Sequence, residues 1–182
     1  MLWIIAIVLV VAFVLYLVLT YNRLVDLKIL VENAWAQIDV QLKRRFDLIP
    51  NLVETVKGYA KHERKIFEEV TKLRTQFFKT TDAAQRIELN DKLTETLRGI
   101  FAVAERYPRL RASKNFKELQ KELERTEDKI AYMRQFYNDA VYNYNKAVRQ
   151  FPSNIVATIF GFKPMQMFQI GKEERKVVKV KF

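Results

Sequence analysis

An uninterrupted apolar run at the N-terminus constrains this chain more than any other feature of its sequence. Residues 2–19 read LWIIAIVLVVAFVLYLVL, which is 18 residues without a charge. As an α-helix the run is about 27 Å long, close to the roughly 30 Å hydrocarbon core of a bilayer. A cleavable signal peptide would instead have a basic start, a shorter apolar run and small residues at a cleavage point. The run therefore predicts a retained transmembrane anchor over residues 1–20.

The cations beside this run predict its orientation. No Lys or Arg precedes it, whereas Arg23 and Lys28 follow it closely. Cytoplasmic flanks of membrane spans carry an excess of Lys and Arg, so we expect the N-terminus outside the cell and the following domain in the cytoplasm. The sequence thus predicts a single-pass protein of the cell membrane.

Residues that form turns are scarce in the rest of the chain. Only four glycines and four prolines occur among 182 residues. Few turns imply long elements, and apolar residues that recur in steps of three and four are typical of helices. We therefore expect an all-α fold, in which the N-terminal transmembrane helix precedes an antiparallel bundle of three long helices and a short C-terminal one.

Three apolar stripes define the long helices. They cover residues 24–77, 89–104 and 116–151. Asp82 stands before the second stripe with a glutamine three residues on, and Asn115 stands before the third with a glutamate three residues on. Both spacings are typical of helix caps.

The segment SNIVATIFGF predicts the short last helix. Ser153 or Asn154 is placed to cap it, and Gly161 falls just past its end. Pro152 precedes the segment and ends the third long helix.

These patterns divide the chain into a membrane anchor (1–20), a helical-bundle domain (21–162) and a basic C-terminal tail (163–182). Beyond Gly171 the tail reads KEERKVVKVKF, and we expect it to be loosely held. The net charge of +11 gathers partly there. Beside a membrane anchor, such charge favours anionic lipid headgroups as partners. Nucleic acid is not expected, because no recognition motif accompanies the charge.

The stretch DVQLKRRFDLIPNLVETV, residues 39–56, carries a proline inside a helical pattern. Pro50 removes one helical hydrogen bond, and its ring crowds the carbonyl four residues earlier. The apolar stripe nevertheless stays in phase across it. We therefore predict a structural kink at Pro50 within a continuous helix.

Charged and polar residues surround this proline. On a helix, Lys43 and Asp47 are four residues apart, a spacing at which opposite charges stabilise each other by a few tenths of a kcal/mol. A solvated face of mutually paired charges is the simplest interpretation, and a binding face for an acidic partner or lipid headgroups is the alternative. The candidate interaction face consists of Lys43, Arg44, Arg45, Asp47 and Asn51.

A second unusual stretch is QFYNDAVYNYNKAV. Tyr137 and Tyr144 fall in the core stripe, while Asn138 and Asn145 are also seven residues apart and share an adjacent face. We expect polar packing, in which these hydroxyl and amide groups satisfy each other or the backbone near Pro50. The alternative is an oligomer face in which buried asparagines fix the register of two copies.

The inventory of side chains argues against several enzyme classes. The chain has no cysteine, which excludes thiolate nucleophiles and cysteine-bound metals. A di-iron bundle needs two Glu-x-x-His motifs, but His62 is the only histidine and Tyr59 stands three residues before it. The four glycines are isolated and form no phosphate-binding loop. The sequence therefore predicts no catalytic residue, no metal and no cofactor.

Several longer blocks resemble a known family. AWAQIDVQLKRRFDLIPNLVETVKGYAKHE, NFKELQKELERTEDKIAYMRQFYNDAV and FPSNIVATIFGF are similar to the blocks that characterise the LemA family. The resemblance implies a small, membrane-anchored bacterial protein with a helical-bundle domain, and it brings no catalytic or ligand-binding role. Phe46 and Phe168 stand where tyrosine would be familiar, so no role that depends on a hydroxyl group is expected at either.

Two hypotheses of function follow. The first is a membrane-anchored, non-enzymatic scaffold or interaction module that binds an unidentified protein partner or self-associates as a homo-oligomer. The second is an accessory or regulatory subunit of a membrane protease or transporter. Co-purification in mild detergent separates them, because a single stoichiometric partner favours the second and self-assembly alone favours the first.

Overall fold

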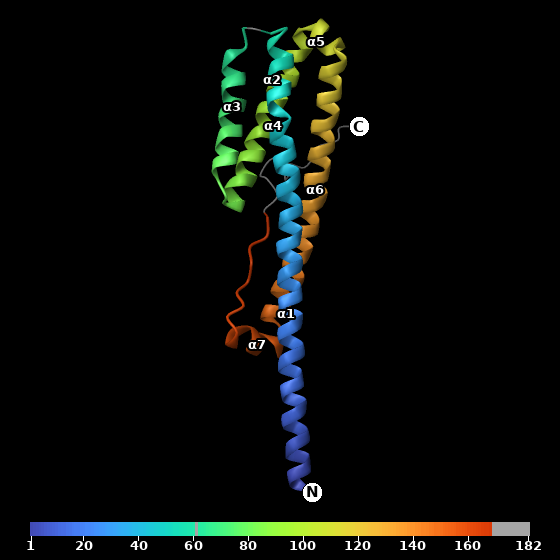
Figure 1. Cartoon of the computed structure of the whole chain (residues 1–182), viewed down its shortest axis with the longest axis vertical. Helices are drawn as coiled ribbons and strands as arrows, with labels where there is room; N and C mark the ends of the chain where they lie inside the picture. The colour runs from blue at the N-terminus through green and yellow to red at the C-terminus, as the bar shows by residue number, and fades with distance from the viewer. Residues whose placement is uncertain (61, 169–182) are drawn as a thin grey trace, which may run out of the picture. The chain divides into compact units, whose positions relative to one another are not determined.

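The computed structural model describes residues 1–60 and 62–168 (Figure 1). In this part of the chain all regular secondary structure is helical, so the expected all-α class is confirmed. The helices are α1 (Leu2–Asp47), α2 (Ile49–Lys57), α3 (Arg64–Lys79), α4 (Ala83–Arg106), α5 (Pro108–Ala112), α6 (Lys114–Arg149) and α7 (Ser153–Ile159). Most of the predicted basic tail, residues 169–182, lies outside the described residues.

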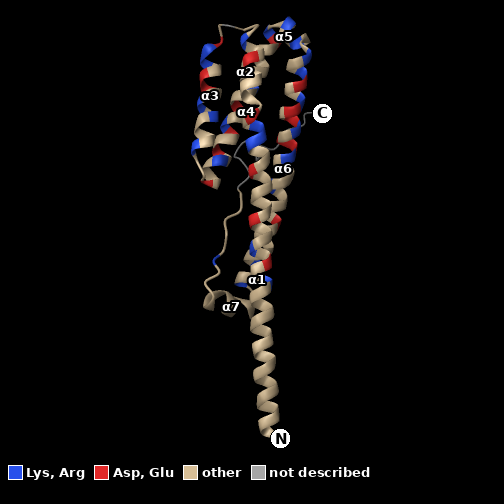
Figure 2. Cartoon of the chain, viewed as in Figure 1, with Lys and Arg blue, Asp and Glu red and all other residues tan. Residues whose placement is uncertain are grey.

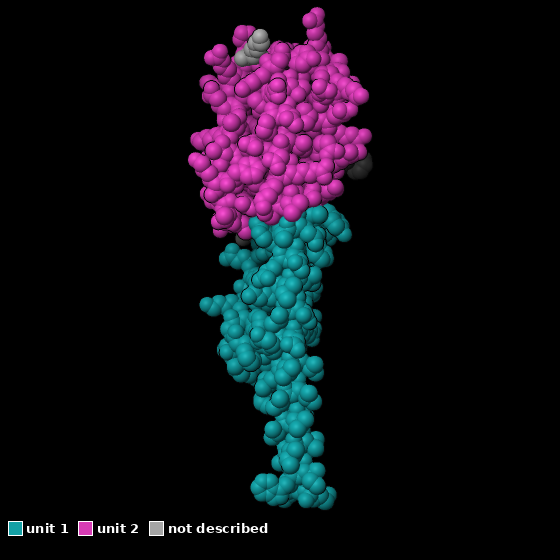
Figure 3. Space-filling view, in the orientation of Figure 1, with its two compact units in different colours: residues 1–37, 132–169 teal, residues 38–131, 170–182 magenta. Residues whose placement is uncertain are grey.

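The chain divides into two compact units (Figure 3). Unit 1 comprises Met1–Gln37 and Tyr132–Gln169, and unit 2 comprises Ile38–Ala131 and Ile170–Phe182. The long helices α1 and α6 each contribute residues to both units. The predicted boundaries at residues 20 and 162 concern the membrane anchor and the tail, and they stay predictions.

The first predicted stripe, residues 24–77, does not form one helix. Between the end of α2 at Lys57 and the start of α3 at Arg64 the chain reverses direction, so that α3 returns antiparallel to α2 and then pairs with α4 (Figure 1). Tyr59 and Ala60 both donate backbone hydrogen bonds to the carbonyl of Val56, at 3.0 and 2.9 Å. The prediction of a continuous helix was wrong because the stripe keeps its apolar phase across the turn, where Ala60 is itself buried. Gly58, a weak helix former, is the local signal of the turn.

At Pro50 the structure has a junction between two helices. α1 ends at Asp47 and α2 begins at Ile49, while Leu48 between them keeps helical dihedral angles of φ −75° and ψ −18°. The N–H of Leu52 donates to the carbonyl of Leu48 at 3.1 Å, which starts the hydrogen bonding of α2. Pro50 is therefore in the first turn of α2, where a missing N–H costs least.

The predicted helix caps have different outcomes. Asp82 caps α4, since its Oδ1 accepts from the N–H of Gln85 at 2.7 Å, as predicted. The cap predicted at Asn115 was wrong, because α5 ends directly before Ser113 and α6 begins at Lys114. The N–H of Lys117 then bonds to the carbonyl of Ser113 at 3.2 Å.

The end of α7 has the form that its glycine predicts. Gly161 has a φ of +74°, a left-handed conformation that glycine adopts without steric cost. Its N–H donates to the carbonyl of Thr158 at 3.3 Å, and the N–H of Phe162 donates to the carbonyl of Ala157 at 2.9 Å. This pair of bonds is a Schellman motif, which satisfies the last carbonyls of the helix. Ser153 does not cap α7, because its Oγ lies 2.6 Å from the carbonyl oxygen of Ala147 at the end of α6.

Unit 2 has an apolar core between its helices. The rings of Phe46 and Phe77 stack there with their centroids 4.1 Å apart. Each large side chain that is fully buried contributes roughly 1.5–3 kcal/mol to stability. The core includes Ile38, Leu42, Ile49, Leu52, Val56, Val70, Leu93, Ile100 and Leu110.

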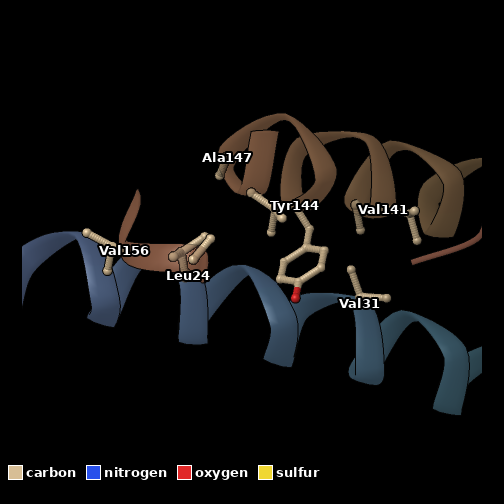
Figure 4. Close-up of a cluster of buried hydrophobic side chains, with 9 residues drawn as sticks. Leu24, Val31, Val141, Tyr144, Ala147 and Val156 are labelled. Atoms are coloured by element: carbon tan, nitrogen blue, oxygen red, sulfur yellow. The ribbon is translucent and has the colours of Figure 1, made fainter. Parts of the chain in front are cut away.

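Unit 1 has its own core, in which α1, α6 and α7 meet (Figure 4). The ring of Tyr144 points from α6 toward α1, between Leu24 and Val31. From α7, Val156 and Ala157 complete the cluster, together with Ala140, Val141, Ala147 and Val148 of α6.

Candidate interaction surfaces

The N-terminal part of α1 is the first surface. Among the described residues, α1 has the one helical segment long and apolar enough to cross a membrane. Its best 18-residue window has a mean hydropathy of 3.2, and none of that window is buried against other residues. The same part of α1 carries no Lys, Arg, Asp or Glu (Figure 2). An exposed apolar helix of this kind matches the hydrocarbon core of a bilayer rather than water.

The last of the three consecutive cations in the candidate face around Pro50, Arg45, lies in the interior of unit 2. The side chain of Arg45 is only 3% exposed. Its guanidinium donates to Oδ1 of Asn90 at 2.6 Å and to the hydroxyl of Thr94 at 2.9 Å, and it pairs with the carboxylate of Glu127. Arg45 therefore joins α1 to α4 and α6, and it cannot belong to a solvated binding face. Three consecutive residues of a helix point in three directions, so one of the three cations can face the core. The sequence alone did not show that this one is Arg45.

The other residues of the predicted face are exposed. Lys43 pairs with Asp39 at 2.7 Å, and Arg44 pairs with Glu122 at 3.0 Å. Asp47 lies 3.8 Å from Arg74 of α3. Asn51 lies one turn further along α2 and is exposed. The exposed remainder is a stripe of mixed charge, not a patch of cations.

Asp39 and Arg86 form a second connection between helices of unit 2. The Arg86 guanidinium bonds to the Asp39 carboxylate, its Nε donates to the carbonyl of Thr80 at 2.9 Å, and the group lies over the ring of Phe77. Burial acts to raise the pKa of the Asp39 carboxyl. The hydrogen bonds and charges of Lys43 and Arg86 outweigh it and hold that pKa below its ordinary value. The carboxylate is therefore a structural anion.

In unit 1, two asparagines of α6 bind the chain that follows α7. The side-chain amide of Asn145 donates to the carbonyl of Met165 at 2.8 Å, and its Oδ1 accepts from the N–H of Met165 at 2.8 Å. Asn138 makes the same two bonds to Phe168, at 3.1 and 2.8 Å. Each amide thus satisfies both backbone groups of one residue, as a neighbouring strand would. We call this arrangement the asparagine clamp.

The spacing of the asparagine clamp follows from helix geometry. Seven residues of α-helix rise about 10.5 Å, and three residues of extended or polyproline II chain cover about 9–10 Å. Asn145 and Asn138 are seven residues apart, and their targets Met165 and Phe168 are three apart in the opposite direction. The segment 163–168 therefore runs antiparallel to α6 in a matched register.

Two tyrosines support the same segment. The hydroxyl of Tyr144 donates to the carbonyl of Lys163 at 3.1 Å, and that of Tyr137 donates to the carbonyl of Gln166 at 3.4 Å. The ring of Tyr137 also packs against Phe168, 4.4 Å between centroids, and Phe168 packs against Trp35 of α1. Burial raises the pKa of both hydroxyls, with Glu32 adding to the effect at Tyr144, so they stay protonated donors.

The four residues of the Tyr-Asn stretch do pack as polar groups, but their partner differs from the one expected. They bond neither to one another nor to the backbone near Pro50; their partner is the backbone of residues 163–168. The tail 163–182 was predicted to be loosely held because it is basic as a whole. Its first six residues, however, include only one cation, and these are the residues that α6 binds. The repeat of Tyr-Asn at seven residues was the available signal of a regular partner.

A metal centre is not formed in the part of the chain that the structure describes. Over residues 1–60 and 62–168, no three His, Cys, Asp or Glu side chains lie close enough together to hold an ion. The polar groups described above contact neighbouring helices or backbone, and none of them forms a nucleophile with its base.

An exposed apolar helix that continues into a bundle of helices identifies this chain as a membrane-associated helical protein. The pattern of the LemA family matches residues 34–182, and the chain belongs to this family.

Curated relatives extend the likeness. The chain is 26% identical to magnetosome protein MamQ 2 of Paramagnetospirillum magneticum, over 92% of this chain and 71% of that protein. It is 23% identical to magnetosome protein MamQ of Magnetospirillum gryphiswaldense, over 87% of this chain and 68% of that protein. Protein LemA of Metamycoplasma hominis is 26% identical, over 80% of this chain and 67% of that protein. Neither the family nor these relatives are known enzymes.

Proposed function

We propose that this protein is a membrane-anchored scaffold, a non-enzymatic interaction module that holds a protein partner at the membrane. Its α1 crosses the bilayer once, and its helical bundle faces the cytoplasm. The scaffold acts by presenting the exposed side of its bundle to the partner or to further copies of itself.

The observation that carries this proposal is how the polar side chains are used. Arg45, Asp39 and the asparagine clamp all bind other parts of the same chain. Such groups hold a shape, and an enzyme would instead leave converging polar groups open to a substrate.

The names of the relatives support a role that is not tied to one reaction. Two of them are named as magnetosome proteins and one as LemA, in different organisms. A shared helical bundle that serves in such different settings suits a scaffold better than a single chemistry.

The partner surface that we propose is what remains exposed of the candidate face. Lys43, Asp47 and Asn51 follow one another in steps of four, so they form one stripe along the α1–α2 junction. Mixed charge suits a partner that offers both signs, which favours a protein surface over a nucleic acid.

The test is crosslinking in membranes, followed by purification of the tagged full chain in mild detergent. We expect a protein assembly whose yield falls several-fold in a variant with Lys43→Ala, Asp47→Ala and Asn51→Ala. The matched control is Glu88→Ala with Lys92→Ala, an exposed pair on α4 at 2.7 Å, and it should leave the yield unchanged.

Two results would change the proposal. A chain that stays monomeric after crosslinking contradicts a scaffold. One stoichiometric protease or transporter, whose activity changes when the chain is absent, would establish the accessory-subunit role in its place.

A further inference from the structure

The segment 151–162, which contains α7, is apolar on two sides. It reads FPSNIVATIFGF and contains no charged residue. On one side, Val156 and Ala157 are buried in the core of unit 1. On the other, Phe151 is 74% exposed and Ile159 is 66% exposed, and Ile155 and Phe160 are exposed as well. Short helices of soluble proteins rarely expose such a group of large apolar side chains to solvent.

The exposed side of α7 lies next to a particular part of α1. The ring of Phe160 packs on Tyr21 of α1, with 4.8 Å between centroids. Phe151 lines a hollow together with Tyr16 and Thr20 of α1. α7 therefore packs beside the end of the apolar run 2–19, at the level where a bilayer that surrounds the run would end.

The composition at this level is that of a membrane interface. Tyrosines are enriched where the hydrocarbon core meets the headgroups, and Tyr16 and Tyr21 both lie here. Amphipathic helices rest in this zone with their apolar side about 5–10 Å deep. The exposed side chains of α7 suit the same zone, because the removal of large apolar side chains from water is favourable.

Cations lie next to the apolar side chains. Arg23 and Lys146 line the hollow that contains Phe151, and Lys163 lines another beside Phe160. Within residues 1–60 and 62–168, none of these three cations forms an ion pair. They are placed to contact the phosphates of lipid headgroups, since an anionic membrane surface attracts nearby Lys and Arg side chains.

We propose that α7 is an interfacial foot: Phe151, Ile155, Ile159 and Phe160 insert into the leaflet that α1 leaves, and Arg23, Lys146 and Lys163 contact its headgroup phosphates. This inference rests on the proposed membrane anchor. Lipid is the occupant because the exposed side adjoins the anchor at the depth where lipid surrounds it.

The absence of cysteine makes the test direct, because a single cysteine can be introduced and spin-labelled at any exposed site. The full chain is reconstituted at low density into vesicles of phosphatidylcholine and phosphatidylglycerol. Labels at Ile155→Cys and Ile159→Cys report the foot, and a label at Val8→Cys reports the anchor. The control is Tyr132→Cys, since Tyr132 is 73% exposed, aromatic and in the same unit. It stands 19 residues before Phe151, about 28 Å along α6.

Accessibility to oxygen and to a water-soluble nickel complex gives the depth of each label. We expect the labels at 8, 155 and 159 to favour oxygen and the label at 132 to favour nickel. A label at 159 as accessible to nickel as the one at 132, with the label at 8 in lipid, overturns the foot while the anchor stands. A label at 8 in water overturns the anchor itself. Protection at 155 and 159 that appears only at high protein density, with spin–spin broadening, overturns the foot by showing that a second copy covers α7.

Discussion

Units 1 and 2 share the same two long helices and each has an apolar core, but the polar contacts that join their segments differ. In unit 2, charged side chains join the helices: Arg45 binds groups of α4 and α6, and Arg86 binds Asp39. In unit 1, an apolar cluster joins α1, α6 and α7, and neutral amides bind the backbone of residues 163–168. Unit 1 also contains the apolar run. Burying charge is costly where water is scarce, so neutral hydrogen bonds suit the unit that contains the proposed membrane anchor.

Among the substitutions that test this contrast, we expect Arg45→Ala to lower the free energy of unfolding most. The change leaves the buried amide of Asn90 and the carboxylate of Glu127 without their partner. Losing one member of a buried pair typically costs roughly 3–5 kcal/mol, and the partial exposure of Glu127 places the expected value near the lower end. Denaturant titration of the full chain in micelles measures the change in the free energy of unfolding.

Arg44→Ala is the matched control for this experiment. Its ion pair with Glu122 is on the surface, where solvent screens the two charges and the pair contributes little. Equal losses of stability in the two variants would contradict the structural role of Arg45.

In unit 1 the corresponding change is Asn145→Ala, with a smaller and local effect. It removes two hydrogen bonds to Met165, each with a net contribution of about 0.5–1.5 kcal/mol. Because 1.4 kcal/mol is a factor of ten, the amide of Met165 should exchange with solvent about 10- to 100-fold faster. Mass spectrometry of hydrogen exchange measures this rate. Asn143→Ala, an exposed neighbour on the same helix, should leave it unchanged, and an equal increase there would argue against the asparagine clamp.

Lowering the pH should affect the two units differently, and the change in stability should be smaller than for the substitutions above. The folded state holds the pKa of Asp39 below its ordinary value. Its ion pairs therefore contribute stability at neutral pH, and this contribution is lost as the pH falls below about 4 and the carboxyl is protonated. We expect the stability of the natural chain to fall more steeply in this range than that of Asp39→Asn. A parallel pH dependence of the two melting temperatures would contradict the prediction. The clamp is uncharged, so the protection of Met165 should not follow this titration.

The smallest effect is expected from Pro50→Ala. Helix propensity favours alanine by roughly 3 kcal/mol in a helix interior, but Pro50 is in the first turn of α2, where most of this difference vanishes. Straightening the junction would also displace Ile49, Leu52 and Val56, which are buried as the helices now run. The melting temperature should therefore stay level or fall slightly. A clear rise, with unchanged partner binding, would show that the proline has no role in shaping the bundle.

Patterns of local origin were predictable from the sequence, and long-range partners were not. The apolar run, the cap at Asp82 and the turn at Gly161 each follow from a few adjacent residues. The reversal after Lys57 was missed, since the apolar period survives the turn. The internal position of Arg45 and the partner of Asn138 and Asn145 depend on segments far along the chain, and a single sequence contains no direct record of such proximity.

The asparagine clamp has a consequence for which changes of sequence the chain tolerates. Among the described residues, both amides hydrogen-bond to main-chain atoms of Met165 and Phe168 and not to their side chains. These contacts are therefore indifferent to the side chains at those positions but sensitive to how many residues separate them. Substitutions other than proline at Met165 and Phe168 leave these hydrogen bonds intact, whereas losing a single residue between Met165 and Phe168 puts one asparagine out of reach of its target. These hydrogen bonds therefore constrain the length of the segment more than its composition, and an alignment that scores identity alone would miss that constraint.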